Sequence, residues 1–178
     1  DCGAELLIHG PEFDEVADQL KGVHQVRACM RMNCGQWSPY EEAIARSEGS
    51  LRPEDRQWDA PWALIYTSGT TGKPKGVEIS YAMAFCNAVA LGSAFQVTSS
   101  SRNLAVMPLF HTGGLNVFAN PVFFHGGTNV VLREFDPGYV ADCLPTPATG
   151  NTHMLAVPTM HAMLLDTPKF REVSGGSL

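Results

Sequence analysis

Hydrophobic positions recur along this chain in two periods, one typical of strands and the other typical of helices. Short apolar runs predict strands at residues 4–9, 26–32, 62–66, 76–80, 104–111, 128–134 and 153–158. Start signals (proline or a hydroxyl side chain) and stop signals (glycine) predict helices at residues 11–21, 39–48, 81–95, 113–124, 137–144 and 158–166. Strands and helices therefore alternate through most of the chain.

This alternation predicts an α/β fold, with parallel-sheet layers and helices on both faces. The first strand, helix and strand are expected to form a βαβ unit, because two parallel strands need a crossover connection of that length. Four apolar residues of this helix lie at i, i+3, i+4 and i+7 and share one face: Phe13, Val16, Ala17 and Leu20.

Specific residues mark several helix boundaries. Ser38, Pro39 and Glu41 match a capping box, in which the serine caps the helix and the glutamate reaches back to it. Ser80 precedes a helix that is apolar on most of its surface, so we expect that helix to be buried on several sides and to pack behind the preceding loop. We expect Thr112 to cap the helix at 113–124.

The composition indicates a globular chain and excludes several classes of function. Its 178 residues, 44% of them hydrophobic, are enough for one domain with a substantial core. The net charge is −6 and no basic tract is present, which argues against a nucleic-acid partner. The apolar runs fall far short of ~18 residues, so we expect no membrane span, and we also expect no signal peptide before the fold.

The cysteines and most histidines carry no recognisable site. Five scattered cysteines, an odd count, favour buried thiols in a reducing compartment and hence a cytoplasmic protein. Cys29 and Cys34 could share a metal ion, but no second pair follows, so we predict no metal site. The histidines expected to be structural are His9, His24, His125, His153 and His161.

Residues 67–76 form the stretch richest in chemistry. They hold three glycines, four side-chain hydroxyls, two lysines and no acid. Glycines allow a close approach of backbone N–H groups to an anion, while hydroxyl and ammonium groups add further donors. The pattern is not a Walker A loop, since Thr67 stands where that motif needs its first glycine and Pro74 follows Lys73. Because both flanks look extended, we expect the loop to join two strands and to bind a polyphosphate.

These ten residues also resemble the phosphate-binding signature of the adenylate-forming superfamily, [ST]-S-G-[ST]-T-G-x-P-K-G, at every position. The resemblance implies the acyl-CoA synthetase branch and ATP as a ligand. The residues implied in binding ATP are Thr67, Ser68, Gly69, Thr70, Thr71, Gly72, Lys73, Lys75 and Gly76. Lys75 belongs to the fixed part of the signature, so it is the lysine expected to act in catalysis, whereas Lys73 occupies a variable position.

A second segment, PLFHTGGL, is similar to a signature of the same superfamily, P-[LM]-F-H-x-x-G-L. By this resemblance His111 is catalytic and faces the acyl substrate together with Gly113, Gly114 and Val117. The two glycines have no side chain to fill space, so we expect room for a fatty or aryl acid.

Two further segments extend the resemblance towards the end of the chain. The closing SGGSL resembles a family segment in which Gly175 and Gly176 pass close to the acyl-adenylate. VVLREFDP resembles a segment that often contacts CoA, although Glu134 stands where the family often has a basic residue and Arg133 lies one position earlier.

The resemblance covers nearly all of the chain and implies that residues 1–178 are a middle piece of the N-terminal AMP-binding domain, truncated at both ends. The acid that helps hold Mg²⁺, the aspartate that binds ribose and the C-terminal catalytic lysine are expected outside it. The implied reaction joins a carboxylic acid to AMP with release of pyrophosphate and then transfers the acyl group to a thiol, usually that of CoA. ATP, Mg²⁺ and CoA are therefore the expected cofactors and co-substrates.

Three functions stay open from the sequence. The first is an acyl-CoA synthetase, which PLFHTGGL favours. The second is a peptide-synthetase adenylation domain, which would need an aspartate for the ammonium of an amino acid. The third is a nucleotide-binding module with no activity of its own. Neither the carboxylic acid nor the oligomeric state follows from these residues.

Overall fold

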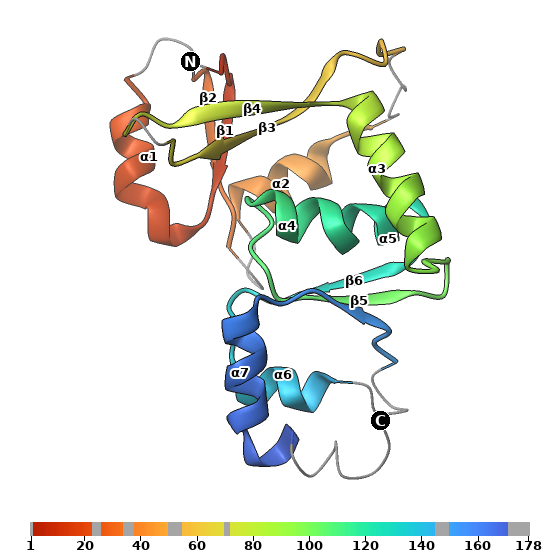
Figure 1. Cartoon of the computed structure of the whole chain (residues 1–178). Helices are drawn as coiled ribbons and strands as arrows, with labels where there is room; N and C mark the ends of the chain where they lie inside the picture. The colour runs from red at the N-terminus through yellow and green to blue at the C-terminus, as the bar shows by residue number, and fades with distance from the viewer. Residues whose placement is uncertain are drawn as a thin grey trace. The chain divides into compact units, whose positions relative to one another are not determined.

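The structure is a computed structural model that describes residues 2–22, 26–33, 38–49, 55–69, 72–144 and 150–170 (Figure 1). The chain divides into two compact units, Asp1–Asp55 and Arg56–Leu178. Both units contain parallel strands, which confirms the α/β class that the sequence predicts.

The first unit contains the predicted βαβ arrangement. Strand β1 (Leu6–His9) pairs in parallel with β2 (Ala28–Arg31), and the crossover holds η1 (Pro11–Phe13) and α1 (Asp14–Leu20). The apolar face predicted for this helix is confirmed, because all four of its residues line one hollow of about 290 Å³ with Leu7 and Ile8 of β1. Ala17 is the most buried of them, at 2% exposure.

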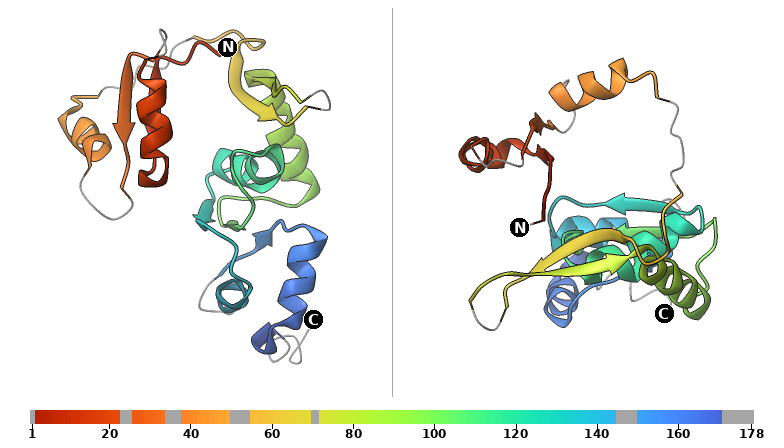
Figure 2. Two further views of the ribbon diagram at one scale, coloured as in Figure 1. Left: turned by 90° about the vertical axis from the view of Figure 1, so that its left-hand side faces the viewer. Right: turned by 90° about the horizontal axis from the view of Figure 1, so that it is seen from above.

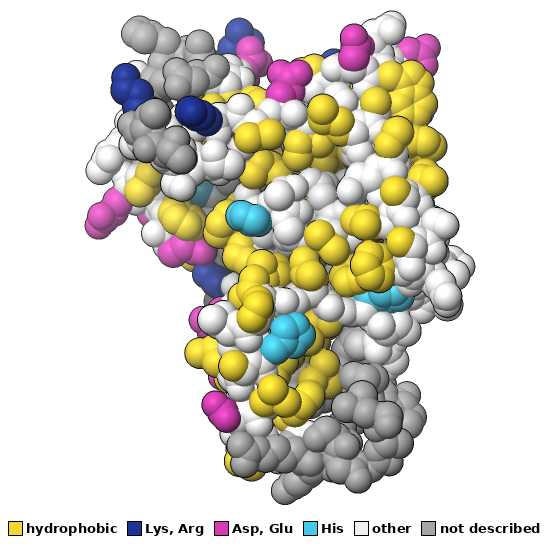
Figure 3. All heavy atoms as spheres, viewed as in Figure 1, with side chains coloured by type: hydrophobic (Ala, Val, Ile, Leu, Met, Phe, Trp, Pro, Cys, Tyr) yellow, Lys and Arg dark blue, Asp and Glu magenta, His cyan; other side chains and the backbone are white. Residues whose placement is uncertain are grey.

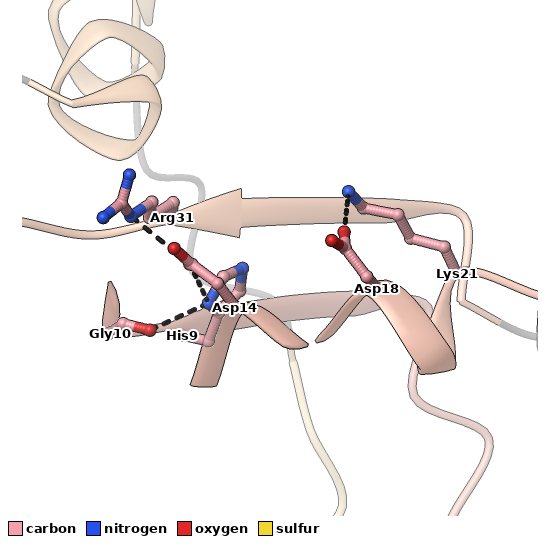
Figure 4. Close-up of polar contacts among 6 residues, drawn as sticks. All are labelled: His9, Gly10, Asp14, Asp18, Lys21 and Arg31. Carbon is pink, nitrogen blue, oxygen red and sulfur yellow. Dashed lines mark hydrogen bonds and ion pairs between the residues drawn. The ribbon is translucent and has the colours of Figure 1, made fainter. Parts of the chain in front are cut away.

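Ion pairs tie α1 to both strands of this unit (Figure 4). Asp14 lies 3.3 Å from Arg31 Nε and 3.6 Å from His9 Nδ1, and His9 Nδ1 also lies 2.9 Å from a neighbouring backbone carbonyl. His9 is therefore structural, as expected. One turn further, Lys21 donates to Asp18 at 2.6 Å, and this contact lowers the pKa of the aspartate and raises the pKa of the lysine.

The next helix, α2 (Pro39–Arg46), begins where predicted but is not held by a capping box. Ser38 occupies the N-cap position, yet its hydroxyl donates to the Glu41 carboxylate and accepts no backbone N–H. A carboxylate is a strong acceptor for a hydroxyl, so the two side chains bond to each other. The helix also ends before Gly49, at Arg46, which pairs with Glu42 one turn back.

The second unit opens with an antiparallel hairpin that leads directly into a long helix. Strand β3 (Pro61–Thr67) pairs with β4 (Lys75–Ser80), and β4 continues into α3 (Tyr81–Ala94) (Figure 1). Ser80 Oγ accepts the Met83 N–H at 3.2 Å, which confirms Ser80 as the cap. The loop between the two strands is the predicted phosphate-binding loop.

A three-stranded parallel sheet follows, in the order β6-β5-β7. Its strands are β5 (Arg102–Ala105), β6 (Thr128–Val131) and β7 (His153–Met154). Leu104 lies at the centre, paired with Val130 on one side and Met154 on the other. The strands are shorter than predicted: β5 ends at Ala105 because the chain turns towards Pro108, which has no N–H to donate to a ladder.

Helices cover both faces of this sheet, as predicted (Figures 1 and 2). On one face lie α6 (Pro137–Cys143) and α7 (Pro158–Asp166), which bury the main core around Leu104, Val106, Val140, Ala141 and Leu164. On the other face lie α4 (Thr112–Gly114), the π-helix η2 (Leu115–Ala119) and α5 (Asn120–Phe124). Asp136 caps α6 by accepting the Tyr139 N–H at 2.6 Å.

Helix α3 is less buried than the sequence predicts. It packs on η2 and α5, and Phe85 meets Phe124 of α5 edge-on, but only Ala88 and Gly92 are buried. Met83 is 60% exposed and Phe85 41%. Figure 3 shows hydrophobic side chains on the surface where Figure 1 draws α3. The apolar composition therefore reflects an uncovered surface in this structure, and the prediction of burial on several sides is wrong.

No helix in the described part of the chain combines the length and the apolar character that a membrane crossing requires.

Candidate active site

The candidate nucleotide site is the loop that joins β3 and β4. Thr67 pairs with Lys75 and Tyr66 with Gly76, so the ladder holds both ends of the loop in register. This confirms the predicted strand–loop–strand arrangement and separates the loop from a Walker A motif, which opens a helix. Thr70 and Thr71, both implied in ATP binding, lie outside the described residues.

Two glycines of this loop adopt backbone conformations that other residues avoid. Gly69 has φ +58° and Gly72 has φ +79°. At Gly69 a Cβ atom would also come within 3.0 Å of the Lys73 carbonyl oxygen, whereas at Gly72 it would meet no atom within 4 Å. Gly69 is therefore required both by its dihedral angle and by a close backbone approach across the loop.

The donors of the loop are exposed. Thr67, Ser68, Lys73 and Lys75 all have exposed side chains. Neither lysine forms an ion pair with another residue that the structure describes, so both ammonium groups are available to a ligand. Hydroxyl, ammonium and backbone N–H donors with no acid among them suit the phosphates of a nucleotide.

The second predicted site segment follows β5. His111 lies six residues beyond the end of that strand, at the N-cap of α4, with an exposed side chain. Its Nδ1 accepts the Gly113 N–H at 3.1 Å, which in the neutral ring leaves the proton on Nε2 as a donor. The predicted cap was Thr112; instead Thr112 begins the helix and its Oγ1 accepts from Asn116.

The two glycines after His111 have different surroundings. A Cβ atom at Gly113 would lie 3.3 Å from His111 Nδ1. At Gly114, which is buried with φ −67°, a Cβ atom would come within 3.0 Å of the Pro108 and Met107 carbonyl oxygens. On the side where a side chain of Gly114 would point, the space is therefore filled by the chain's own backbone, and the role of Gly114 beside an acyl tail stays a prediction. Val117 is half-buried in η2.

The π-helix η2 interrupts the single helix that the sequence predicts over residues 113–124. The available signal was Pro121, which lies inside that helix and lacks an N–H. The sequence analysis also missed Asn87, whose Nδ2 donates to the Asn116 carbonyl of this π-helix at 2.6 Å. The hairpin and the His111 segment therefore share α3 as a support: α3 continues from β4 and packs on η2.

Two other histidines of this unit, His125 and His153, are held by structural contacts. His125 Nδ1 lies 2.8 Å from the Pro121 carbonyl oxygen. His153 Nε2 lies 3.1 Å from the Phe95 carbonyl oxygen, and its ring packs edge-on against Phe118. Among the predicted residues, His24, Cys34, Gly175 and Gly176 lie outside the described ranges.

The described residues fit a nucleotide better than a metal ion. Within the described ranges, no three His, Cys, Asp or Glu side chains come together to hold a metal ion. The ammonium, hydroxyl and backbone N–H groups of the loop match phosphate oxygens, which accept hydrogen bonds and carry negative charge.

Comparison with known proteins agrees with the geometry of the loop. The sequence model of the family described as AMP-binding enzyme matches residues 1–177. The chain belongs to the AMP-binding enzyme family.

Similar members of the AMP-binding enzyme family are named as CoA ligases. The chain is 34% identical to the indoleacetate–CoA ligase of Aromatoleum aromaticum, across 100% of this chain and 35% of that protein. It is 31% identical to a feruloyl-CoA synthase of Amycolatopsis, across 100% of this chain and 34% of that protein. The chain thus spans about a third of the length of these relatives.

Solved structures give the same fold. The ATP-bound MatB of Rhodopseudomonas palustris has a TM-score of 0.84 at 25% identity, covering 98% of this chain and 34% of that one. The o-succinylbenzoate–CoA synthetase of Bacillus subtilis, solved with its acyl-adenylate intermediate, has a TM-score of 0.71 at 28% identity, covering 96% and 42%. These matches confirm the predicted membership and fold class.

Proposed function

We propose that the full-length protein is an AMP-forming acid–thiol ligase that activates a carboxylic acid with ATP and transfers the acyl group to CoA. The observation that carries this proposal is the loop between β3 and β4, whose donors Thr67, Ser68, Lys73 and Lys75 are exposed and whose sequence contains no acid. The names of the relatives, which are CoA ligases, support the choice of acceptor. The 178 residues then belong to the N-terminal AMP-binding domain.

In the first half-reaction a carboxylate oxygen attacks the α-phosphorus of ATP, and pyrophosphate leaves. Negative charge develops on the phosphate oxygens in that step, and preorganised donors stabilise it most when they need not move. The proposed roles are phosphate binding by the loop and, for Lys75, stabilisation of the developing charge. When Mg²⁺ is bound it neutralises phosphate charge, and its protein ligands lie outside the described residues.

In the second half-reaction the thiol sulfur attacks the acyl carbonyl carbon, and AMP leaves. We place His111 beside the acyl group: its Nε2 is free to donate, because Nδ1 is engaged by Gly113. Gly113, Val117, Gly175 and Gly176 are proposed to line the same region. A contact of Arg133 or Glu134 with CoA is not part of the proposal.

An aromatic acid is the substrate class that the relatives favour. Two relatives matched over the whole chain are named for indoleacetate and ferulate. A third, matched over 62% of the chain at 39% identity, is named for 2-succinylbenzoate. A fatty acid is the second candidate. A cytoplasmic location stays a prediction.

The test is acid-dependent ATP–pyrophosphate exchange by the purified full-length protein. The panel contains indoleacetate, ferulate, a long fatty acid and the twenty amino acids, each with and without CoA. We expect exchange with an aromatic acid and a CoA thioester as the product. Exchange that depends on an amino acid would replace this proposal with a peptide-synthetase activity. ATP binding without exchange for any acid would leave a nucleotide-binding module.

A further inference from the structure

The π-helix η2 leaves one backbone carbonyl without a main-chain donor. The Asn120 N–H donates to Leu115 O, five residues back, and so is not available to Asn116 O, four residues back. The next donor along the helix would be residue 121, but Pro121 has no N–H. The Asn116 carbonyl therefore needs a partner from elsewhere in the fold, since a half-buried carbonyl without one is costly.

That partner is Asn87, from the middle of α3. Its Nδ2 donates to Asn116 O at 2.6 Å, across 29 positions of sequence. The side chain of Asn116 is held as well: its Nδ2 donates to Thr112 Oγ1 at 3.1 Å, and its Oδ1 accepts from Asn120 at 3.3 Å. Asn87 thus fixes a residue of η2 whose side chain also bonds back to α4.

The sheet holds the other end of the same segment. Asn129 of β6 donates through Nδ2 to the Ala119 carbonyl at 2.8 Å. Asn103 of β5 in turn donates to Asn129 Oδ1 at 2.9 Å. Side-chain amides of Asn87 and Asn129 therefore hydrogen-bond to backbone carbonyls near the two ends of η2. A π-helix held in this way keeps a geometry that an α-helix would not reproduce, and such turns are frequent at functional sites.

The position of Asn87 links the two parts of the candidate site. Helix α3 begins directly after β4, the second strand of the phosphate-binding hairpin. The segment that Asn87 holds begins at His111 and contains Val117, both implied in contact with the acyl group. We propose that Asn87 is a positioning residue, which acts through the Asn116 carbonyl to set the acyl-binding segment 111–117. This inference rests on the proposed function.

The test compares Asn87→Ala with a matched control in the full-length protein. Asn151 is the control, because its Nδ2 also donates to a backbone carbonyl, that of Cys143, at 2.6 Å, but away from η2. We expect Asn87→Ala to lower kcat/KM for the carboxylic acid about tenfold, the usual effect of leaving a carbonyl unpaired, with KM for ATP within about twofold of wild type. Asn151→Ala should leave kcat/KM for the acid within the same twofold. The proposal would be overturned if Asn87→Ala and Asn151→Ala lowered kcat/KM for the acid equally, or if Asn87→Ala raised KM for ATP as much as it lowered kcat/KM for the acid.

A second background tests the route through Asn116. Pro121→Ala restores a backbone N–H that can donate inside the helix, so the Asn116 carbonyl no longer depends on Asn87. In that background Asn87→Ala should cost much less than tenfold in kcat/KM for the acid. If Asn87→Ala lowers kcat/KM for the acid equally with and without Pro121, Asn87 does not act through the Asn116 carbonyl.

Hydrogen exchange separates a failure of this inference from a failure of the proposed function. Asn87→Ala should raise amide exchange across residues 111–120, while Asn151→Ala should not. Unchanged exchange there would overturn the positioning role even if the enzyme is active. Raised exchange in a protein that activates no acid would instead support the positioning role and refute the proposed reaction.

Discussion

Lys75 and Lys73 lie two positions apart, but the hairpin gives them different settings. Lys75 is the first residue of β4 and pairs with Thr67, so its backbone is fixed, whereas Lys73 precedes Pro74 within the loop. A fixed donor stabilises developing charge better than a mobile one. We therefore predict that Lys75→Ala in the full-length protein slows single-turnover adenylation by ~10²–10³ and weakens ATP binding less than it slows the reaction. Lys73→Ala should be milder, and equal effects of the two substitutions would contradict the assignment.

Gly69 and Gly72, two glycines of the nucleotide loop, can be compared by the same substitution to alanine. Both have positive φ, which costs another residue about 1–2 kcal/mol. Only Gly69 has a backbone oxygen, that of Lys73, within 3.0 Å of its missing Cβ. Gly69→Ala should therefore weaken ATP binding, measured by calorimetry, by more than tenfold, and Gly72→Ala by less. Equal losses would mean that the cross-loop approach has no role in shaping the site.

At the scale of elements, the turn from β5 into α4 depends on Gly114. A Cβ atom there would overlap the Pro108 and Met107 carbonyl oxygens, and overpacking of this kind typically costs about 1–3 kcal/mol. We predict that Gly114→Ala lowers the melting temperature and reduces activity with short and long acids alike. Gly113→Ala is the control, because its nearest neighbour is the His111 ring at 3.3 Å and not fixed backbone, and it should lower the melting temperature less than Gly114→Ala. A loss confined to long acids, at an unchanged melting temperature, would instead place the side chain of residue 114 in the acyl pocket.

Local signals predicted most of the elements correctly. Ser80 and Asp136 cap their helices through bonds to residues three positions away, and such bonds depend on sequence neighbours alone. The π-helix was not predicted. Pro121 indicates an interrupted helix because it lacks an N–H, but the carbonyls of η2 are bonded by Asn87 and Asn129, which lie on distant elements. The capping box at Ser38 failed for a different reason, since both partners are local: the Ser38 hydroxyl donates to the Glu41 carboxylate and accepts no backbone N–H.

At the scale of the whole molecule, the donor content of the nucleotide loop could be predicted because one short segment carries it. The surroundings of His111 could not, since the N–H of Gly113 and the backbone at Pro108 fill positions that no spacing rule describes. The exposure of α3 was also unpredictable, because burial depends on what else packs on a helix and not on its own composition.

Residues 1–178 on their own are expected to be inactive. They span about a third of the length of the relatives named as an indoleacetate–CoA ligase and a feruloyl-CoA synthase. The described residues also supply no cluster of metal ligands. We predict that these 178 residues alone release no pyrophosphate above a blank with ATP, Mg²⁺ and aromatic or fatty acids. Carboxylate-dependent release from them would contradict this prediction.

The central claim is that the carboxylate attacks the α-phosphorus of ATP, and an isotope label tests it directly. The full-length protein would be given ATP, CoA and an aromatic acid labelled with ¹⁸O in its carboxylate. Mass spectrometry of the products should find one ¹⁸O in AMP, because the attacking oxygen stays on phosphorus when the thiol displaces AMP. Label in orthophosphate, with ADP as the nucleotide product, would show attack at the γ-phosphorus and would contradict the account.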